Sequence, residues 1–580
     1  MLRPDRSTTR ALLALCALAA SMQPALAFNV YKVDPDCVAS GAYAKIQDAL
    51  DIAALSFGTD YVWISNTHAY NETVFISDQD VIIEGGFTDC NDNDIGPADR
   101  SYLSGLDKSS PVIRIAGTSH VVLSNLQIGG ADSGLSDGGA IRFSGQGGLT
   151  IGASMLNNNT AKRGGGIYFY AQGGPATLTL LDGTDIFNNT ASTSGGGIYV
   201  EGPARLLVQS LDTAIEFNHA ETSGGGIYVG VQARADIGAP GFNGGVVHSN
   251  NAESGGGIAV AGGGVLRVFG HDVTHPSSIA ANKAILYGGG IYAEGDVCLF
   301  SPYMLANDAL QCAALFHNGT GGIYINAGFP GRLGTECGPE SVAALGGVVL
   351  ACSEFSCSSI DDSTAQAGFG LYGAIIYAQG GELNATRLQM QNNLGGSVIQ
   401  TRGTTTTIAT SLVTDNFVAD ALISIDGSLP GSSAFIGSTF AHNTIDGASV
   451  FKVINAAPVA MTRDIIAEPG HATASTDGPL TVSYTMSNDI GTLPHNGNPT
   501  VVANDPLFAG PFDYRLRAAS PAVDFAPAAG GTDLDGMPRA VDLPQEANKF
   551  GPTDLGAYEL QVAFACDNHA DAVFCDGFDP

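Results

Sequence analysis

Short apolar and polar runs alternate along this chain, and the runs recur at a nearly constant spacing. Five segments share a template in which an apolar residue lies three positions before an asparagine, and an alanine, three glycines and an aliphatic residue follow it. The asparagines are Asn159, Asn189, Asn218, Asn250 and Asn282, which lie 30, 29, 32 and 32 residues apart. A period near 30 built from short strands and glycine turns is typical of solenoids. The pattern therefore predicts one elongated repeat fold.

Each repeat also predicts how its residues are used. In the segment Gly164–Tyr170, three glycines permit positive φ and close stacking of successive coils, and Ile167 begins an alternation of period two. Isoleucine and valine should therefore point inward and tyrosine outward. We expect each asparagine to stack on the asparagine of the next coil, so that its amide donates and accepts along the axis and keeps buried turn backbone hydrogen-bonded.

Degenerate copies flank the five clear repeats. Gly138–Ile141 precedes them, and Leu315–Asn318 with Gly321–Tyr324 follows them. Looser pairs of an apolar residue and an asparagine occur at Met390/Asn393, Val413/Asn416 and Phe440/Asn443. The solenoid should therefore extend well beyond the central repeats.

The region before the repeats fits the same solenoid. Residues 44–54 carry apolar side chains at helical spacing and predict an amphipathic helix that caps the first coil. Residues 61–65, 81–86 and 121–128 predict strands. Residues 60–480 would then form about 15 coils along about 70 Å of axis, at one rung per ~4.8 Å. The expected fold class is an all-β parallel β-helix solenoid.

Composition and charge narrow the function classes. The chain has 77 glycines, 26 prolines and only 14 % charged residues, which argues against a helical bundle. Its net charge of −32 argues against nucleic acid and anionic membrane surfaces as partners. Residues 1–27 resemble a signal peptide with three arginines, an apolar run and an Ala-Leu-Ala site before Phe28. We expect an exported protein, secreted or on a bacterial cell surface, with no direct membrane span.

Nine cysteines remain after the predicted cleavage. In an exported protein disulfides are the default, and an odd count leaves at least one thiol outside an intramolecular pair. We expect Cys37 to pair with Cys90, Cys298 with Cys312, and Cys566 with Cys575. Cys337, Cys352 and Cys357 are left to compete among themselves. Zinc binding is disfavoured, because no Cys-x-x-Cys pair is present.

The Gly-Gly-Gly-Ile and apolar-x-x-Asn elements resemble the repeats of the polymorphic outer-membrane proteins. Only Gly138–Ile141 and Phe440–Asn443 match the literal forms of that family, Gly-Gly-Ala-[Ile/Leu/Val] and Phe-x-x-Asn. The resemblance implies a single-stranded, right-handed parallel β-helix of the pectin-lyase-like kind. The outer-membrane barrel that closes those proteins has no counterpart here, so a self-sufficient autotransporter is not expected.

A second resemblance covers residues 504–560. Five motifs are similar in order and spacing to the choice-of-anchor Q region of exported bacterial β-helix proteins: Asp505–Phe508, Asp513–Leu516, Ser520–Asp524, Asp533–Arg539 and Asp554–Glu559. The predicted organisation is a signal peptide over 1–27, an N-terminal cap over 28–58, a β-helix over 59–500, this C-terminal region over 501–560 and a cysteine-containing tail over 561–580. The tail residues 573–579 resemble short endings of some exported proteobacterial proteins.

Candidate chemistry lies mostly in one predicted tyrosine ladder. Tyrosine follows the glycine-rich turn at Tyr168, Tyr199, Tyr228, Tyr292 and Tyr324, interrupted by Ala259. If each copy is one coil, these side chains form an exposed ladder that could bind sugar rings or the apolar face of a partner. The alternative is that tyrosine stacking merely stabilises the sheet.

Catalytic residues cannot be assigned from the sequence. Pectin-lyase-like cylinders often host polysaccharide lyases and hydrolases, which need a base near carboxylates or an acidic pair. Scattered acids and bases lie at Glu84, Asp361, Asp362, Arg387 and Asp415, and no pair among them is preferred.

Cofactor and metal signals are weak. The acidic clusters over 89–94 and 533–535 suggest calcium but fit no EF-hand loop, so solvated turns are the default and no cofactor is expected. His271 and His275 are read as an ordinary polar turn. His219, His248, His317 and His442 lie beside ladder asparagines, which predicts turn positions and no shared pocket.

We therefore expect an exported, non-catalytic β-helix that acts as an adhesin or an extracellular binding scaffold. Its partner would be an extracellular polysaccharide or a cell-surface protein of a host or neighbouring cell. The alternatives are a carbohydrate-active β-helix enzyme and a purely structural surface or matrix protein.

Overall fold

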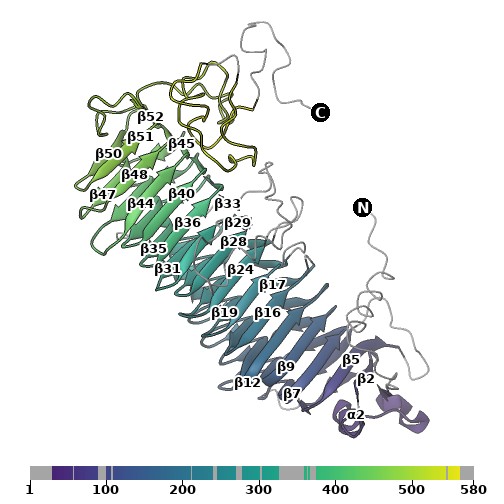
Figure 1. Ribbon diagram of the computed structural model, residues 1–580. Coiled ribbons are helices and arrows are strands. Elements are labelled where there is room, and N and C mark those ends of the chain that lie inside the picture. Colours follow the sequence, from purple (N-terminus) through teal and green to yellow (C-terminus); the bar gives the residue numbers. More distant parts are fainter. Residues whose placement is uncertain are drawn as a thin grey trace.

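The computed structural model describes residues 29–56, 58–88, 100–105, 109–210, 212–238, 244–269, 277–300, 303–325, 358–361, 364–365, 374–543 and 547–561. Figure 1 shows an elongated stack of strands, with a small helical segment at one end and an irregular region at the other. The expected all-β fold is confirmed, because the strands pair in parallel from one coil to the next. The molecule is a parallel β-helix solenoid.

The N-terminal end of the solenoid is closed by a short helix. After β1 (Val30–Val33) come the 3₁₀ helix η1 (Pro35–Ser40) and α2 (Ile46–Ala53). The predicted helix over 44–54 is confirmed, since α2 buries four residues at helical spacing: Ile46, Ala49, Leu50 and Ala53. Three of them join the same core as the first strands of the solenoid. The helix thus covers core that the first coil would otherwise expose.

The largest sheet has 27 strands arranged in two parallel runs. The first run, which we call the ring run, contains β4 (Val74–Ser77), β15 (Ile198–Glu201), β19 (Ile227–Val229), β23 (Ile258–Val260), β27 (Ile291–Ala293), β31 (Leu315–Asn318), β35 (Ala374–Gln379), β39 (Ser397–Arg402), β43 (Ile423–Asp426), β47 (Ser449–Ile454) and β50 (Ala472–Thr476). Three long strands, β7 (Ile113–Ser124), β9 (Ile141–Gly152) and β12 (Ile167–Leu180), belong to both runs and join them.

The second run continues beside the first. Besides β1 it contains β2 (Asp60–Ser65), β5 (Asp80–Phe87), β16 (Ala204–Val208), β20 (Arg234–Ile237), β24 (Val265–Phe269), β28 (Asp296–Phe300), β32 (Gly322–Ile325), β36 (Glu382–Thr386), β40 (Thr405–Ala409), β44 (Ser432–Ile436), β48 (Val459–Thr462) and β51 (Leu480–Ser483).

A 16-stranded sheet forms another side of the solenoid, with one short strand per coil. Its strands are β3 (Ala69–Asn71), β6 (Ser101–Ser104), β8 (Leu126–Gly129), β10 (Met155–Asn157), β13 (Asp185–Phe187), β17 (Ala214–Glu216), β21 (Val246–His248), β25 (Ser278–Ala280), β29 (Tyr303–Leu305), β33 (Ser358–Asp361), β37 (Leu388–Gln391), β41 (Leu412–Thr414), β45 (Thr439–Ala441), β49 (Ile465–Ala467), β52 (Thr485–Ser487) and β53 (Val501–Val502). These 16 rungs agree with the expected number of coils.

A 10-stranded sheet adds a third side to ten of the coils, after the position of the ladder asparagine. Its strands are β11 (Thr160–Ala161), β14 (Thr190–Ala191), β18 (His219–Ala220), β22 (Asn251–Ser254), β26 (Lys283–Tyr287), β30 (Asp308–Gln311), β34 (Thr364–Ala365), β38 (Leu394–Gly395), β42 (Phe417–Val418) and β46 (Thr444–Ile445). The alanine of the repeat template is buried here, as Ala191, Ala220 and Ala252 pack together.

One apolar core runs along the axis. The inward positions expected from the repeat are fully buried, including Ile167, Ile198 and Ile227. The strand predicted over 121–128 is divided in two, because Asn125 takes φ 57° and turns a corner between β7 and β8. Left-handed residues of this kind form the corners of a coil, and asparagine adopts that conformation more readily than most residues.

The C-terminal region is irregular and packs against the last coils. Beyond β53 the described residues form turns and isolated bridges, such as the one between Phe508 and Leu516. A second hydrophobic cluster joins this region to outward side chains of the 16-stranded sheet, among them Leu412, Ile465 and Met486. The region therefore covers an outer face that would otherwise expose apolar side chains to water.

Candidate ligand-binding face

Aromatic side chains follow one another along the outer surface of the ring run. Tyr168 pairs in register with Tyr199, and Tyr199 with Tyr228. Ala259, Tyr292, Phe316 and Tyr377 then follow on successive coils of the described chain. We call the aromatic members the ring column: Tyr168, Tyr199, Tyr228, Tyr292, Phe316 and Tyr377. They face outward because their strand neighbours, such as Ile198 and Val200, fill the core.

The rings stack on one another, which changes what they offer to a ligand. Ring centroids are 5.3 Å apart between Tyr168 and Tyr199 and 4.8 Å apart between Tyr199 and Tyr228. Tyr168, Tyr199 and Tyr377 are buried, while Tyr228 and Tyr292 are half-buried. The prediction of an exposed ladder is therefore wrong for most of the rings. Neighbouring rings cover the ring faces, so a ligand meets mainly edges and hydroxyl groups.

The column ends differently from the sequence prediction. Tyr324 lies in the second run, where it pairs with Cys298 and Asn384 and packs with Phe269 and Phe300. It is therefore not a member of the ring column. The isoleucine position of this coil is taken by Leu315, which pairs with Ile291 and places Phe316 among the rings.

The residues before Leu315 explain why the sequence pattern places Tyr324, and not Phe316, in the ladder. Two alanines, Ala313 and Ala314, replace the expected glycines before Leu315, so the sequence pattern places the turn at the glycines 321–322. The signal that marks the true coil is Met304, three residues before the ladder asparagine Asn307. Phe316 and Tyr377 were consequently missed by sequence reasoning.

Acidic or amide side chains border the ring column at fixed positions. The Tyr199 hydroxyl donates to Glu201 at 2.9 Å, Tyr292 donates to Glu294 at 3.0 Å, and Tyr377 donates to Gln379 at 2.7 Å. The spacing of two residues along a strand places both partners on one face. Burial raises the pKa of Tyr199 and Tyr292, and the neighbouring carboxylates raise it further. These phenols therefore stay protonated and donate hydrogen bonds at neutral pH.

The side chain of Arg163 packs against the first two rings of the ring column, Tyr168 and Tyr199. The Arg163 guanidinium lies 4.9 Å from the centroid of Tyr168 and 5.0 Å from that of Tyr199. It also donates two hydrogen bonds to Asp137, at 2.9 and 2.8 Å, and these bonds raise the pKa of Arg163. Its charge is thus already matched by a carboxylate.

The asparagines of the repeats form a buried ladder. Asn159 Nδ2 donates to Asn189 Oδ1 at 2.9 Å, and the backbone N–H of Asn159 donates to the same oxygen at 3.1 Å. The same two bonds recur from Asn189 to Asn218, Asn250, Asn282 and Asn307, and again from Asn393 through Asn416 to Asn443. Amides of the ladder also donate to a backbone carbonyl of the preceding coil, such as that of Leu156 for Asn189. The asparagine amides are used in these structural hydrogen bonds, so the asparagines are not ligand sites.

Carboxylates close the hydrogen-bond ladders at the C-terminal end. Glu468 accepts bonds from the Nδ2 and the backbone N–H of Asn443, at 2.6 and 3.1 Å. Asp464 accepts from the N–H groups of Ser438 and Thr462. Burial raises the pKa of each acid to about 7. Both groups lie within the last coils, where the C-terminal region packs.

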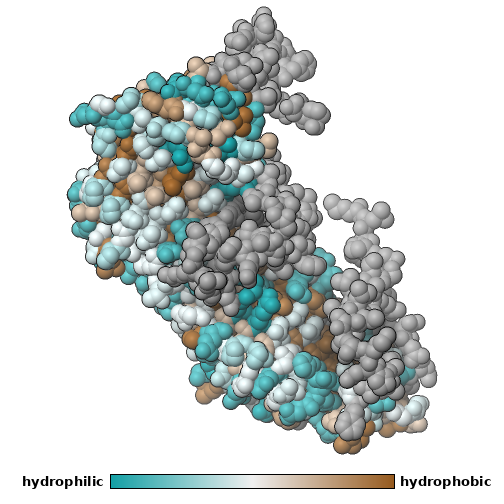
Figure 2. Space-filling model, viewed as in Figure 1, coloured by the Kyte–Doolittle hydropathy of each residue, from teal (hydrophilic) through white to brown (hydrophobic). Residues whose placement is uncertain are grey.

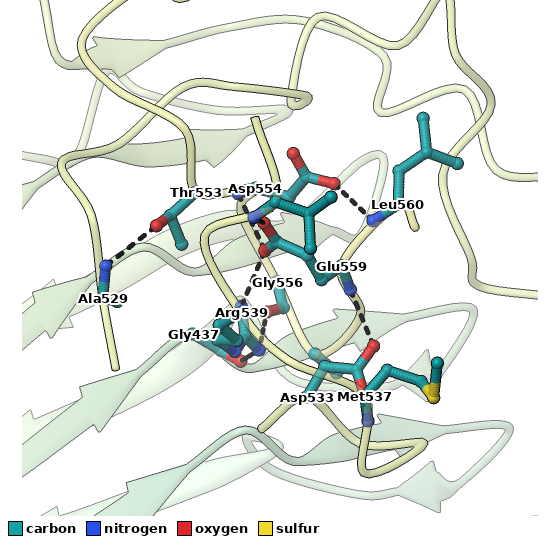
Figure 3. Close-up of polar contacts among 12 residues, drawn as sticks. Gly437, Ala529, Asp533, Met537, Arg539, Thr553, Asp554, Gly556, Glu559 and Leu560 are labelled. Atoms are coloured by element: carbon teal, nitrogen blue, oxygen red, sulfur yellow. Dashed lines mark hydrogen bonds and ion pairs between the residues drawn. The ribbon is translucent and has the colours of Figure 1, made fainter. Parts of the chain in front are cut away.

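The acidic motifs of the C-terminal region hold its irregular backbone. Figure 3 shows Asp533, Asp554 and Glu559 accepting bonds from one another's backbone N–H groups and from those of neighbouring residues. Both oxygens of each carboxylate are used in this way. Carboxylates thus replace the hydrogen bonds that a sheet would supply. The motif acids have a structural role in the described chain.

Two buried arginines attach this region to the solenoid. Arg539 donates to the carbonyls of Gly437 and Gly556, at 3.2 and 2.7 Å. Arg387 donates to the carbonyl of Leu534. Arg387 was a candidate base in the sequence, and its burial against the C-terminal region makes it a docking residue instead.

The other scattered acids do not converge on one site. Glu84 lies on β5, and Asp415 lies at a corner of a late coil. Asp362 lies outside the described residues, and nothing is described of the Asp361 side chain. One polar cluster does form around Asp415, whose Oδ2 accepts from the Tyr514 hydroxyl at 3.0 Å, while His442 Nδ1 lies 3.3 Å from that hydroxyl. Thr414 also contacts the Tyr514 hydroxyl.

Potential metal ligands gather at one place in the described residues. Asp34, Asp36 and His68 have ligand atoms within 4.8 Å of one another. His68 Nε2 is 3.0 Å from Asp36, and Asp34 already caps η1 by accepting from the N–H of Asp36. Of the two acidic clusters that suggest calcium in the sequence, residues 89–94 lie outside the described residues. Asp535 pairs with Arg515 and Asp533 accepts two backbone N–H bonds.

The cysteine and histidine predictions have mixed outcomes. Cys312 is a buried thiol whose pKa is raised by burial, so the predicted Cys298–Cys312 disulfide is not formed. The two residues pack in different hydrophobic clusters. Cys90, Cys566 and Cys575 lie outside the described residues, and the pairing of Cys37 with Cys90 and of Cys566 with Cys575 stays a prediction.

His317 was predicted at a turn, and this is wrong. His317 occupies the inward position that Ala293 has on the preceding coil. It is fully buried, with Nε2 3.2 Å from the carbonyl oxygen of Gly295. Burial lowers its pKa. His271 and His275 lie outside the described residues.

The outer surface mixes residues of different polarity. Figure 2 shows hydrophobic residues scattered among hydrophilic and neutral ones on the face in view. Within the described ranges, no helix is long and apolar enough to cross a membrane.

No protein-family model matches the chain, and a search of curated proteins finds no significant relative.

Proposed function

We propose that this protein is an exported, non-catalytic binding scaffold of the bacterial surface or surroundings, and that the ring column with its polar border is its ligand-binding face. The observation that carries the proposal is the repetition of one donor–acceptor arrangement along a straight outer face. A phenol and a carboxylate or amide occur together at Tyr199, Tyr292 and Tyr377. A repeating face of this kind suits an extended, repeating ligand.

A polysaccharide is the ligand class that this chemistry favours. Sugar hydroxyls both donate and accept hydrogen bonds, and carboxylates, amides and phenols provide both complements. Coils follow one another about every 4.8 Å, a spacing comparable to the length of one pyranose unit in an extended chain. The three pairs lie three and two coils apart, so they recur at about two to three such units along the face. The half-buried rings of Tyr228 and Tyr292 add apolar edges on which a sugar ring can rest.

The predicted export is the basis for the extracellular setting of the proposal. The first 27 residues resemble a signal peptide, and residues 504–560 resemble the choice-of-anchor Q region of exported proteins. The right-handed, pectin-lyase-like assignment and attachment to the cell surface belong to the same proposal. A purely structural matrix role would use the same solenoid without a ligand.

Binding to immobilised neutral and acidic polysaccharides tests the proposal. The double variant Tyr228→Ala/Tyr292→Ala should weaken binding at least tenfold, because two rings and two hydroxyls are lost at ~1 kcal/mol or more each. The control is Phe217→Ala, which removes a 54 % exposed aromatic ring outside the ring run. If the wild type binds no glycan, or if the double variant and the control lose affinity equally, the proposal fails.

One observation favours an enzyme as the second candidate. Asp415, His442 and Tyr514 form a hydrogen-bonded acid–base cluster, and His442 is exposed to solvent. Burial and the Asp415 charge raise the pKa of Tyr514, so this phenol would act as a proton donor and not as a base. Unsaturated or reducing-end products from the same polysaccharides, abolished by His442→Ala, would establish the enzyme and contradict the scaffold.

A further inference from the structure

Two arginines extend the ring column toward the N-terminal end. Arg114 of β7 pairs in register with Arg142 of β9, and Arg142 pairs with Tyr168. On the preceding coil Phe75 pairs with Arg114. The guanidinium of Arg114 lies 5.9 Å from the Phe75 centroid, and that of Arg142 lies 5.9 Å from the Tyr168 centroid. The two cations are therefore neighbours on adjacent rungs, with an aromatic ring on each side.

This arrangement is unfavourable unless something compensates it. Like charges directly opposite one another in a sheet destabilise the pairing. Other arginines of the same sheet have acidic partners: Arg205 and Arg267 with Asp236, and Arg402 with Asp426. Among the described residues, no ion pair joins Arg114 or Arg142 to a carboxylate, although the chain has 56 acidic residues against 24 basic ones.

The side chains are accessible to a ligand. Arg114 is exposed and Arg142 is half-buried. Each guanidinium lies at a cation–π distance from its ring, Arg114 from Phe75 and Arg142 from Tyr168. Guanidinium groups bind carboxylate and sulfate oxygens through paired, charge-assisted hydrogen bonds. The pair has the composition of an anion site at the head of the ring column.

We propose that Arg114 and Arg142 bind a carboxylate or sulfate group of an acidic extracellular polysaccharide whose chain continues along the ring column. This inference rests on the proposed function and names the class of its ligand. The bound anion supplies the compensating charge that the protein itself does not place beside the pair.

The charge of the rest of the face limits how many acidic groups the ligand carries. Glu201 and Glu294 border the ring column, and the whole chain carries −32. A polymer with an acid on every sugar would meet these carboxylates after leaving the arginine pair. The ligand is therefore a heteropolysaccharide in which neutral sugars separate the acidic ones.

Glycan binding by the full chain tests the inference. The probes are hyaluronan oligosaccharides, with a carboxylate on alternate sugars, polygalacturonate, with one on every sugar, dextran sulfate, neutral dextran, and polyglutamate as an acidic peptide. We expect hyaluronan to bind more tightly than dextran or polygalacturonate. Arg114→Gln/Arg142→Gln should weaken hyaluronan binding at least tenfold, and Arg142→Lys should retain part of it. Arg517→Gln, which removes one exposed positive charge in the C-terminal region, should leave it unchanged.

Stronger binding to dextran sulfate than to hyaluronan, still lost in the double glutamine variant, would keep the arginine site with sulfate as its anion. It would overturn the limit on acid density, because dextran sulfate carries acidic groups on successive sugars. Equal affinity of the wild type and the double variant would overturn the inference. Strongest binding to polygalacturonate or to polyglutamate would overturn the ligand class.

Two further readouts separate the possible failures. Binding of dextran that depends on Tyr228 and Tyr292 but not on the arginines would retain the proposed function and refute this inference. Absence of all glycan binding would refute both. The melting temperature of the double glutamine variant should equal or exceed that of the wild type, because repulsion between like charges is relieved. A lower melting temperature would show that the pair is structural.

Discussion

Glu468 at the end of the asparagine ladder makes stability depend on pH. Its carboxyl is 3 % exposed and accepts hydrogen bonds from Asn443. Burial raises its pKa from 4.5 to about 7. The folded state therefore keeps a proton on Glu468 at a pH where the unfolded chain has released it. The contribution of Glu468 to the free energy of unfolding is fully present below pH 4.5 and is lost as the pH rises through about 7.

The size of the effect follows from the two pKa values. Ionising a carboxyl whose pKa is raised from 4.5 to about 7 costs about 3 kcal/mol more in the fold than in the unfolded chain. Glu468→Gln removes the ionisation and keeps an oxygen that accepts from Asn443. We expect the variant to match the wild type near pH 4 and to be more stable by about 3 kcal/mol at pH 8.

Urea unfolding from pH 4 to pH 9 measures this difference, and hydrogen exchange locates it in the last coils. A solenoid opens most easily at its ends, so the exchange of β45 and β49 should respond first. The control is Glu221→Gln, which neutralises an exposed glutamate of a central coil. A stability difference that does not change with pH, or one equal to that of the control, would refute the reasoning.

Three further predictions concern the solenoid and its C-terminal region. Asn218→Ala removes the acceptor of two buried ladder bonds and should lower the free energy of unfolding by ~2–4 kcal/mol in urea titrations, whereas an equal melting curve would contradict a structural ladder. Gly225→Ala should reduce the melting temperature by several degrees, because a Cβ there would clash with the carbonyl of Gly256 on the next coil; an unchanged melting temperature would show that the coils can separate slightly. Arg539→Gln weakens the bonds to Gly437 and should speed limited proteolysis of the C-terminal region, and cleavage at the wild-type rate would argue against docking through this residue.

Repetition made much of the fold predictable from the sequence. In a solenoid every coil meets nearly identical neighbours, so a local pattern fixes both the secondary structure and the contact with the next coil. Ile198 and Asn189 show this, since one is buried in the core and the other joins the ladder, as their places in the template indicate. The helix over 46–53 followed from its apolar spacing for the same local reason.

The candidate site was predictable only in part. Tyr199 and Tyr228 were identified, but their mutual stacking leaves only edges available, and stacking depends on the distance between coils. Phe316 joined the column because Leu315 occupies the isoleucine position after two alanines, and the sequence around it offered a competing glycine turn. Arg114 gave no signal in the chain, because its neighbour Arg142 is 28 residues away.

Local spacing along the chain accounts for the periodic elements of the solenoid: the inward aliphatic residues, the ladder asparagines and the glycine turns, each fixed by its neighbours in the template. Tertiary structure alone decided which outward side chains share a column. It also decided that Arg387 and the acids of the C-terminal motifs hold that region together and against the last coils. The physical reason is that contacts within a repeat are set by local spacing, whereas contacts between distant segments depend on coil register and docking.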